Sequence, residues 1–145
     1  MTNLLCIHGH SCCEIRINNL SLICDPWLLG SAYWRSWWNF PKSESLDSLI
    51  KIWNTKENFY VYLTHQHWDH FHGPTLRKIY KECKHVKFLI PQTPEFRIRK
   101  DLINVLPYAE IKELVHAKNY FLDKKINILS FQTGPITSDS SLAIF

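Results

Sequence analysis

Apolar and polar positions alternate along the first 25 residues of the chain. The stretch NLLCIHGHSCCEIRINNLSLICDPW predicts three short strands, at 3–8, 12–18 and 20–25, with Asn18 and Asn19 as a tight hairpin turn. These strands would form a small antiparallel meander. Residues 28–43, LLGSAYWRSWWNFPKS, contain Gly, Pro and many aromatic side chains without a clear period, which predicts a long structured loop.

A helical period follows in three places. Apolar residues at i, i+3, i+4 and i+7 predict the first helix, after a serine cap at Ser43 or Ser45; they are Leu46, Leu49, Ile50 and Trp53. The second helix is expected at 73–83, with Pro74 in its first turn. The third is expected at 93–104, capped by Thr93 and with Pro94 at its first position.

Further β-rich runs separate and follow these helices. We expect strands at 58–64 and 85–91, and others near 113–121, 125–131 and 140–145. The order predicts one layered α/β domain over residues 1–145, with mixed sheets flanked by helices. SSLAIF is apolar up to the last residue, and since a strand needs a neighbour, we expect a domain that is incomplete at its C-terminus.

Composition narrows the function classes only slightly. The chain has 145 residues, 46% hydrophobic and 21% charged, and six Trp, which we interpret mainly as core. Seventeen Lys and Arg against thirteen Asp and Glu give a net charge of +4, too small without a clustered basic face to indicate nucleic-acid binding. The sequence has no apolar run of membrane-spanning length and no signal-peptide pattern. Five cysteines without paired spacing fit a reducing compartment, so we expect a cytoplasmic protein.

The stretch LTHQHWDHFH, at 63–72, carries the candidate chemistry. Side chains two apart on an extended segment point the same way, so His65 and His67 would converge, Asp69 would continue the alternation and His70 would leave it at a bend. Imidazoles with a carboxylate form a mixed N/O donor set suited to Zn²⁺, and also to Fe or Mn. The spacing is neither H-E-x-x-H nor that of a zinc finger.

Simple loop histidines are the alternative to a metal site. Four histidines in so short a window, with an aspartate among them, make this alternative the weaker one for the cluster. It is the better interpretation for His72, His85 and His116, which are isolated or lie outside the spaced set.

The cluster also resembles a known motif. THQHWDH, Thr64 to His70, matches the HxHxDH signature of the metallo-β-lactamase superfamily, and it follows a strand and precedes a helix as in that family. GHSCCEIRINNLSLICDPWLLG resembles the first strands of the ascorbate-phosphate lactonase branch, and DPWLLGSAYWRSWW is similar to the CMP-N-acetylneuraminate hydroxylase-like branch. The resemblance spans roughly residues 4 to 90. It implies the first half of a metallo-β-lactamase αββα sandwich.

The resemblance implies roles for individual residues. His65 and His67 would bind a first metal and Asp69 and His70 a second, so that one or two Zn²⁺ ions, or Fe or Mn, are expected. Asp69 would also be catalytic, by orienting a water or accepting its proton. Asp25 would support the cluster without binding the ion, and His10 would lie near the pocket mouth.

The sequence departs from the family pattern in two ways. The family supplies a third histidine further along, but no histidine follows His116, and FQTGPITSDSS offers only Asp139 as a strong ligand. A fragment, a second chain that completes the site, or a degenerate site would each explain this. Cys6 and His8 form one C-x-H pair, but Trp27 stands where a Rieske C-x-x-H would place a histidine after Cys24, so no Rieske centre is expected.

These features predict a metal-dependent hydrolase that acts on an ester, lactone or phosphoester bond of a small-molecule substrate. The aromatic residues at 33–40 would either wall a pocket for a sugar or an acyl chain or pack over a sheet edge. Two alternatives remain open. One is a metal-binding protein of the same fold that is inactive or is completed by an oligomeric partner, and the other is an RNA-processing nuclease, against which the modest charge argues.

Overall fold

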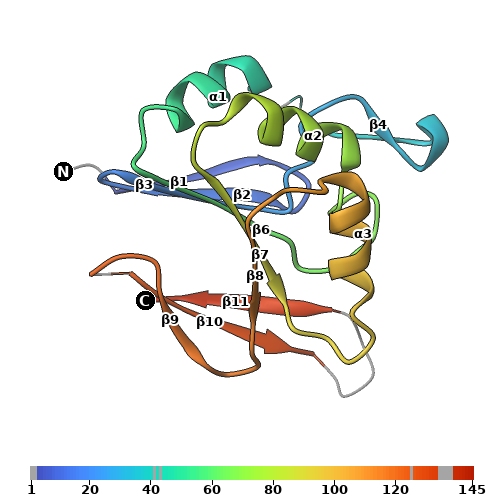
Figure 1. The fold of residues 1–145 in the computed structure, drawn as a ribbon. Coiled ribbons are helices and arrows are strands. Elements are labelled where there is room, and N and C mark those ends of the chain that lie inside the picture. Colours follow the sequence, from blue (N-terminus) through green and yellow to red (C-terminus); the bar gives the residue numbers. More distant parts are fainter. Residues whose placement is uncertain (1–2, 41, 43, 125, 134–138) are drawn as a thin grey trace.

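A six-stranded mixed sheet lies at the centre of the fold (Figure 1). The computed structural model describes residues 3–40, 42, 44–124, 126–133 and 139–145. The strand order is β1-β2-β3-β6-β7-β8. The strands are β1 (Asn3–Gly9), β2 (Cys12–Ile17), β3 (Leu20–Cys24), β6 (Asn58–Tyr62), β7 (Val86–Pro91) and β8 (Ile111–Leu114).

The first three strands form the predicted antiparallel meander. Ile17 pairs with Leu20, so Asn18 and Asn19 alone make the turn. Asn18 has a φ of 50°, a left-handed conformation that asparagine adopts more readily than most residues. From β3 to β8 all neighbours are parallel, and the carboxyl ends of these strands therefore lie at one edge of the sheet.

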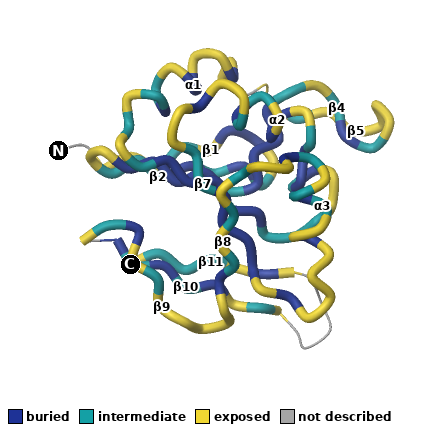
Figure 2. The backbone as a smooth tube through the Cα atoms, in the orientation of Figure 1, coloured by how far each residue is buried: buried dark blue, intermediate teal, exposed yellow. Residues whose placement is uncertain are grey.

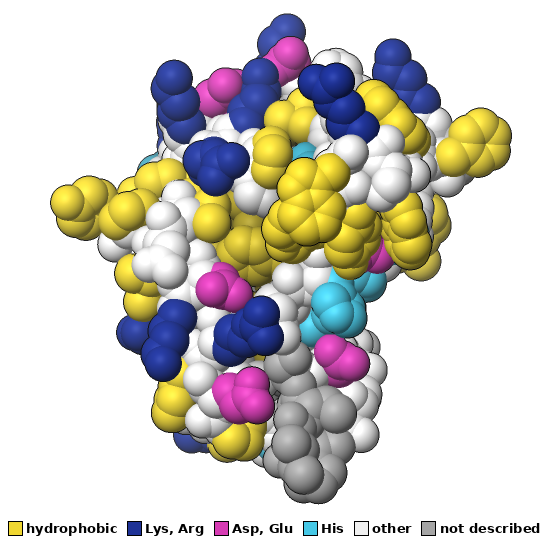
Figure 3. All heavy atoms as spheres, turned by 90° about the vertical axis from the view of Figure 1, so that its right-hand side faces the viewer, with side chains coloured by type: hydrophobic (Ala, Val, Ile, Leu, Met, Phe, Trp, Pro, Cys, Tyr) yellow, Lys and Arg dark blue, Asp and Glu magenta, His cyan; other side chains and the backbone are white. Residues whose placement is uncertain are grey.

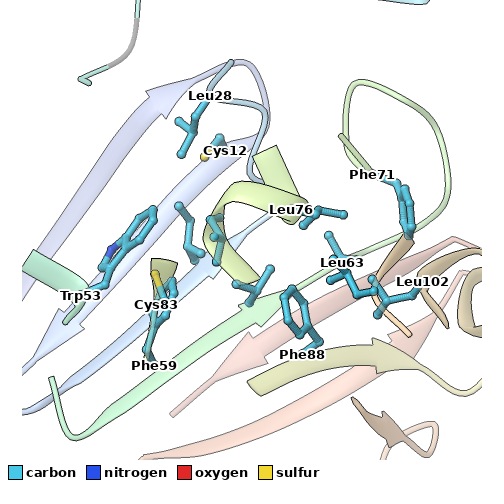
Figure 4. Packing of buried hydrophobic residues seen from close by; sticks show 14 of the residues in the cluster. Cys12, Leu28, Trp53, Phe59, Leu63, Phe71, Leu76, Cys83, Phe88 and Leu102 are labelled. Carbon is cyan, nitrogen blue, oxygen red and sulfur yellow. The ribbon is translucent and has the colours of Figure 1, made fainter. Parts of the chain in front are cut away.

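Three helices cover one face of this sheet (Figure 1). They are α1 (Leu46–Trp53), α2 (Gly73–Glu82) and α3 (Arg97–Val105). The apolar residues predicted for α1 are all buried, and the proline of α2 stands in its first turn as expected. Between the helices and the sheet, side chains such as Trp53, Phe59, Leu76 and Phe88 pack into a continuous core (Figure 4).

A second, three-stranded sheet covers the opposite face. It has the order β11-β10-β9 and is built from β9 (Asn119–Phe121), β10 (Asn127–Gln132) and β11 (Ser140–Ile144). Leu22, Tyr62, Leu89 and Ile128 belong to the apolar cluster between the two sheets. The layers are thus helices, mixed sheet and second sheet, and the buried stretches run between them (Figure 2). This agrees with the predicted α/β architecture.

The aromatic segment after β3 is more ordered than a loop. It contains a two-stranded hairpin, β4 (Ser31–Ala32) and β5 (Trp37–Trp38), around the 3-10 turn η1 (Tyr33–Arg35). All three residues of η1 have positive φ angles. Trp34 is 84% exposed and Phe40 88% exposed, so the aromatic load of this segment lies on the surface rather than in the core.

Two expectations for the elements were wrong in detail. The third helix begins at Arg97, not near Thr93, because Phe96 has a left-handed φ of 51° and its N–H closes a turn on the Thr93 carbonyl. The strand expected at 113–121 is two strands, β8 and β9, because the chain reverses at Ala117, where φ is 54°.

The expected serine cap of α1 is present in position only. Ser45 is the N-cap residue of α1, but its side chain makes no capping hydrogen bond. Ser43, the other expected cap, lies outside the described residues. Among the helices in the described part of the chain, none combines the length and the apolar character needed to cross a bilayer.

Candidate metal centre

The candidate residues meet at the edge where the parallel strands end. β3 pairs in parallel with β6, with Cys24 opposite Tyr62, so the residues that follow these two strands are neighbours. Asp25 is the next residue on one side, and Thr64 and His65 follow on the other. β1 runs antiparallel to β2 and β2 antiparallel to β3, which brings the end of β1 and His10 to the same edge.

Asp25 holds two of the motif residues in place. Its Oδ1 accepts the backbone N–H of Thr64 at 2.8 Å, and its Oδ2 lies 2.8 Å from Nδ1 of His70. A carboxylate only accepts, so Nδ1 of His70 carries the proton and, in a neutral ring, Nε2 has the free lone pair. Asp25 is buried and has a φ of 45°. Its conformation and contacts thus orient His70.

Thr64 connects the same carboxylate to His65. The Thr64 hydroxyl donates to Oδ2 of Asp25 at 2.7 Å, and it also lies 2.8 Å from Nδ1 of His65. Since the hydroxyl has one proton and gives it to Asp25, it accepts from Nδ1–H of His65. A neutral His65 therefore has its lone pair on Nε2. One carboxylate thus fixes the tautomers of two histidines.

Asp69 is held from both sides. Tyr33 donates to its Oδ1 at 2.7 Å, and Nε2 of His10 lies 2.7 Å from its Oδ2. Asp69 is 7% exposed. Burial alone would raise the pKa of Asp69, but the hydrogen bond from Tyr33, with the one from His10 and the charge of His70, lowers it. The carboxylate is therefore ionised and fixed in orientation.

His65 and His67 face each other, as the extended spacing predicts. Nε2 of His65 lies 2.9 Å from Nδ1 of His67, and the ring of His65 packs against that of His70 at 4.1 Å between centroids. The alternation does not continue to Asp69, because the backbone turns at His67, whose carbonyl accepts the N–H groups of His70 and Phe71. Asp69 is brought in by this turn, not by the strand period.

The donor set is of a kind that binds a divalent cation. One ligand atom each from His10, Asp69 and His70 lie within 4.8 Å of one another. Nε2 of His70 is 3.5 Å from Oδ2 of Asp69, so an unprotonated Nε2 and a carboxylate oxygen face each other. Two acceptors in this position repel each other unless a proton or a cation lies between them. The residues present therefore fit a metal ion bound through nitrogen and carboxylate oxygen.

The pKa values of His65 and His70 are shifted in opposite directions. Burial lowers the pKa of His65, and the nearby His70 lowers it further. For His70, burial also acts to lower the pKa, but the hydrogen bond and charge of Asp25 outweigh it and the net shift is upward. Asp139 contributes negative charge to both rings. His70 therefore holds a proton more readily than His65 does.

A cavity of about 440 Å³ opens beside these rings. Its walls include Asp25, His65, His70 and Asp139, and Ser140 and Leu142 of β11 contribute the side formed by the second sheet. Figure 3 shows histidine side chains at the surface of this region, next to a group of hydrophobic side chains. Asp139, the acidic residue expected near the site, is exposed and lies at this cavity.

A second cavity, of about 670 Å³, lies on the other side of the histidine turn. Tyr33, Trp34 and Trp68 line it together with Arg35 and Arg77. The ring of Trp68 stacks on Tyr33 at 5.9 Å between centroids. The aromatic segment thus forms a pocket wall, which was one of its two expected roles.

Sequence reasoning gave Tyr33 a place only in the aromatic segment, with no contact to Asp69, and it gave no role to Thr64 or Ser11. Ser11 Oγ lies 3.1 Å from Nδ1 of His70. Thr64 belongs to the quoted motif and could have been noticed there, whereas nothing local marks Tyr33, which reaches Asp69 only through the fold of the hairpin.

The remaining histidines have ordinary structural surroundings. His72 is buried and contacts the hydroxyl of Thr75, and His116 accepts the N–H of Gln132. His85 is exposed. His8 is buried, and its Nε2 lies 2.9 Å from Oε2 of Glu14. Its ring therefore contacts a buried carboxylate and does not belong to the histidine cluster.

Residues 4–133 match the family model described as a beta-lactamase superfamily domain. The chain is 28% identical over 115 residues to the cytidine monophosphate-N-acetylneuraminic acid hydroxylase of Xenopus laevis. The matched region covers 72% of this chain and 18% of that protein. The chain is 39% identical over 69 residues to the Asterias rubens enzyme of the same name, covering 46% of this chain and 10% of that protein. The chain therefore spans less than a fifth of these two relatives.

Solved structures show the same fold at low identity. CmlA, described as a diiron beta-hydroxylase from Streptomyces venezuelae, superposes with a TM-score of 0.69 at 17% identity, covering 99% of this chain and 27% of that one. Igni18, described as a novel metallo hydrolase from Ignicoccus hospitalis, superposes with a TM-score of 0.66 at 19% identity, covering 97% of this chain and 55% of that one.

Proposed function

Because this chain belongs to the beta-lactamase superfamily domain family, we propose that it provides the metal-binding part of a metal-dependent hydrolase that cleaves an ester, lactone or phosphoester bond. The observation that carries the proposal is the single connected set of donors at the sheet edge. His10, Asp69 and His70 converge within 4.8 Å, and the pair of His65 and His67 adjoins them.

The proposed ligands are those expected from the motif: His65, His67, Asp69 and His70. His10 is added as a candidate, because one of its ring nitrogens lies within 4.8 Å of the ligand atoms of Asp69 and His70. A bound Zn²⁺ ion, or Fe or Mn, would activate water and stabilise the negative charge that develops on the substrate. Zn²⁺ suits the number of imidazoles in the set.

The protein side chains would prepare the site for this chemistry. Asp25 and Thr64 keep the lone pairs of His70 and His65 on Nε2, on the side away from Asp25. Tyr33 and His10 fix the Asp69 carboxylate, which would orient a water or accept its proton. The neighbouring cavities would receive a small-molecule substrate, and the five free cysteines favour a reducing, cytoplasmic location.

An oxygenase is the second candidate. The curated relatives named above are hydroxylases, and one structural neighbour is described as a diiron beta-hydroxylase. No cysteine of the sequence has a histidine three residues after it, so the chain offers no C-x-x-H half of a Rieske site. The electrons would then have to come from outside residues 1–145.

Metal content and turnover test the proposal together. The purified protein is analysed for Zn, Fe and Mn, and then assayed for hydrolysis of a bis-aryl phosphodiester and an aryl lactone. We expect stoichiometric metal and hydrolysis that are both lost in His70→Ala and retained in His85→Ala, a matched change of an exposed histidine. Reductant-dependent O₂ consumption without hydrolysis would favour the oxygenase. Bound metal without either activity would indicate a binding protein or one completed by a partner.

A further inference from the structure

Two cysteines lie directly opposite each other on neighbouring strands. Cys13 of β2 is the register partner of Cys24 of β3 in an antiparallel pair. Opposed residues in such a pair have Cα atoms about 4.5–5.5 Å apart and side chains on the same face of the sheet. A disulfide needs Cα atoms about 4.4–6.8 Å apart. The backbone therefore already places this pair within reach of a disulfide.

The other three cysteines do not compete for this partner. Side chains alternate along β2, so Cys12 points to the opposite face, where it is buried in the core under the helices. Cys6 is paired with Glu14 and shares that opposite face, and Cys83 belongs to the same helix-side core. Among the five cysteines, all of which lie in the described residues, Cys24 is thus the one facing Cys13.

Both thiols also border an open space. Cys13 and Cys24 are only partly buried, and both line the cavity of about 440 Å³ that adjoins Asp25 and His70. A small oxidant can therefore reach them. A hydrogen bond from Cys24 lowers the pKa of Cys13 against the opposing effect of burial, and the same contact raises the pKa of Cys24. Cys13 is the better nucleophile of the two and Cys24 the protonated partner.

We propose that Cys13 and Cys24 form a redox-active dithiol, which a peroxide oxidises to an intramolecular disulfide in the wall of this cavity. The Cys13 thiolate attacks one peroxide oxygen, the O–O bond breaks, and a sulfenic acid and hydroxide form. The Cys24 sulfur then attacks the Cys13 sulfur, the S–O bond breaks, and the departing hydroxide takes the Cys24 proton to become water. Overall, two thiols and one hydrogen peroxide give one disulfide and two waters. The inference does not require a metal in the adjacent site.

Peptide mapping tests the pair directly. The reduced protein is treated with a small excess of hydrogen peroxide, alkylated and cleaved with trypsin. Cleavage after Arg16 and Arg35 separates the two cysteines. We expect peptides 1–16 and 17–35 to appear as one linked species, two hydrogens lighter than their sum, and to separate after reduction.

Variants assign the bond within peptide 1–16, which also carries Cys6 and Cys12. Cys6→Ser and Cys12→Ser should retain the linked species, whereas Cys13→Ser and Cys24→Ser should reduce it by about tenfold or more. Linkage that persists in Cys13→Ser, or wild-type protein in which Cys13 is oxidised without linkage, would overturn the proposal.

A measurement on unchanged protein covers the case in which a variant does not fold. Phenylarsine oxide binds two neighbouring thiols at once, so one equivalent should remove two thiols from titration with a disulfide reagent. Mapping of the two protected cysteines should identify Cys13 and Cys24. Protection of any other pair, or of none, would contradict the proposed dithiol.

Discussion

The carboxylate of Asp25 lies 2.8 Å from Nδ1 of His70, although the two residues are 45 positions apart in the sequence. The contact exists because β3 and β6 are parallel neighbours that end at the same edge. Through it, a residue that is not itself a proposed ligand determines which nitrogen of His70 is available to a metal. The order of the strands therefore places Asp25, and Asp25 acts by orienting His70.

Asp25→Asn should weaken metal binding by about 10- to 100-fold, the range usual for residues that orient metal ligands. Asparagine tolerates the left-handed backbone at this position, and its carbonyl can still accept the N–H of Thr64. Its NH₂ group would face Nδ1 of His70, favour the other tautomer and place a proton on Nε2. Competition with a chromophoric chelator measures the affinity. Asp47→Asn, which changes an exposed carboxylate on α1, should have no effect, and an equal loss in both variants would refute this role.

Tyr33→Phe should lower metal affinity by about tenfold, equivalent to ~1.4 kcal/mol for a hydrogen bond to a charged group. The phenol donates to Oδ1 of Asp69, and without it the carboxylate is less well oriented and its pKa rises. The same chelator competition reports the change. Tyr108→Phe is the control, because Tyr108 is 91% exposed. Unchanged affinity in Tyr33→Phe would mean that the tyrosine only closes the neighbouring pocket.

The sequence was informative where local pattern decides the structure. The meander, all three helices and the strand before the histidine turn follow from alternation, helical period, Asn-Asn and proline positions, and all were found. The motif also marked the segment in which the donors gather. These features depend on residues near one another in the chain, which is why they can be inferred without a structure.

Long-range features were harder to infer. The start of α3 depends on the left-handed φ of Phe96, and no residue type at that position announces it. Tyr33 meets Asp69 only because the hairpin of the aromatic segment folds over the histidine turn. The contact of His10 with Asp69 likewise requires β1 to end at the same edge as β6. Such contacts are fixed by strand order and loop path, which no local pattern encodes.

Tyr62→Phe should destabilise the fold by about 1–3 kcal/mol, the cost of leaving buried hydroxyls without a partner. Ser140 donates to the Thr64 carbonyl, so it accepts from Tyr62, which in turn accepts from Ser130. This chain joins the central strand β6 to both β10 and β11. Urea unfolding followed by tryptophan fluorescence measures the change. The free energy of unfolding of Tyr108→Phe should equal that of the wild type within error. An equally small change in Tyr62→Phe would show that the hydroxyl chain does not stabilise the contact between the sheets.

Glu14 is a fully buried carboxylate whose ionisation should govern stability in acid. Burial alone would raise its pKa, but donors from four side chains outweigh it and lower the pKa from 4.5 to about 2. The donors are His8, Arg16, Ser21 and Trp53. Because the folded-state pKa is below the unfolded one, the stabilisation is complete above about pH 4.5 and is lost as the pH falls towards 2.

The lowered pKa of Glu14 corresponds to a stabilisation of the fold by about 3 kcal/mol at neutral pH. The free energy of unfolding, measured in urea at pH 7, 5, 4 and 3, should fall steeply below pH 4.5 in the wild type. Glu14→Gln should be less stable at pH 7, because four donors then face a neutral amide, and its stability should change less between pH 5 and 3. Glu110→Gln, at an exposed ion pair with Lys87, should keep the wild-type pH profile. Parallel profiles for Glu14→Gln and the wild type would show that another group controls the acid transition.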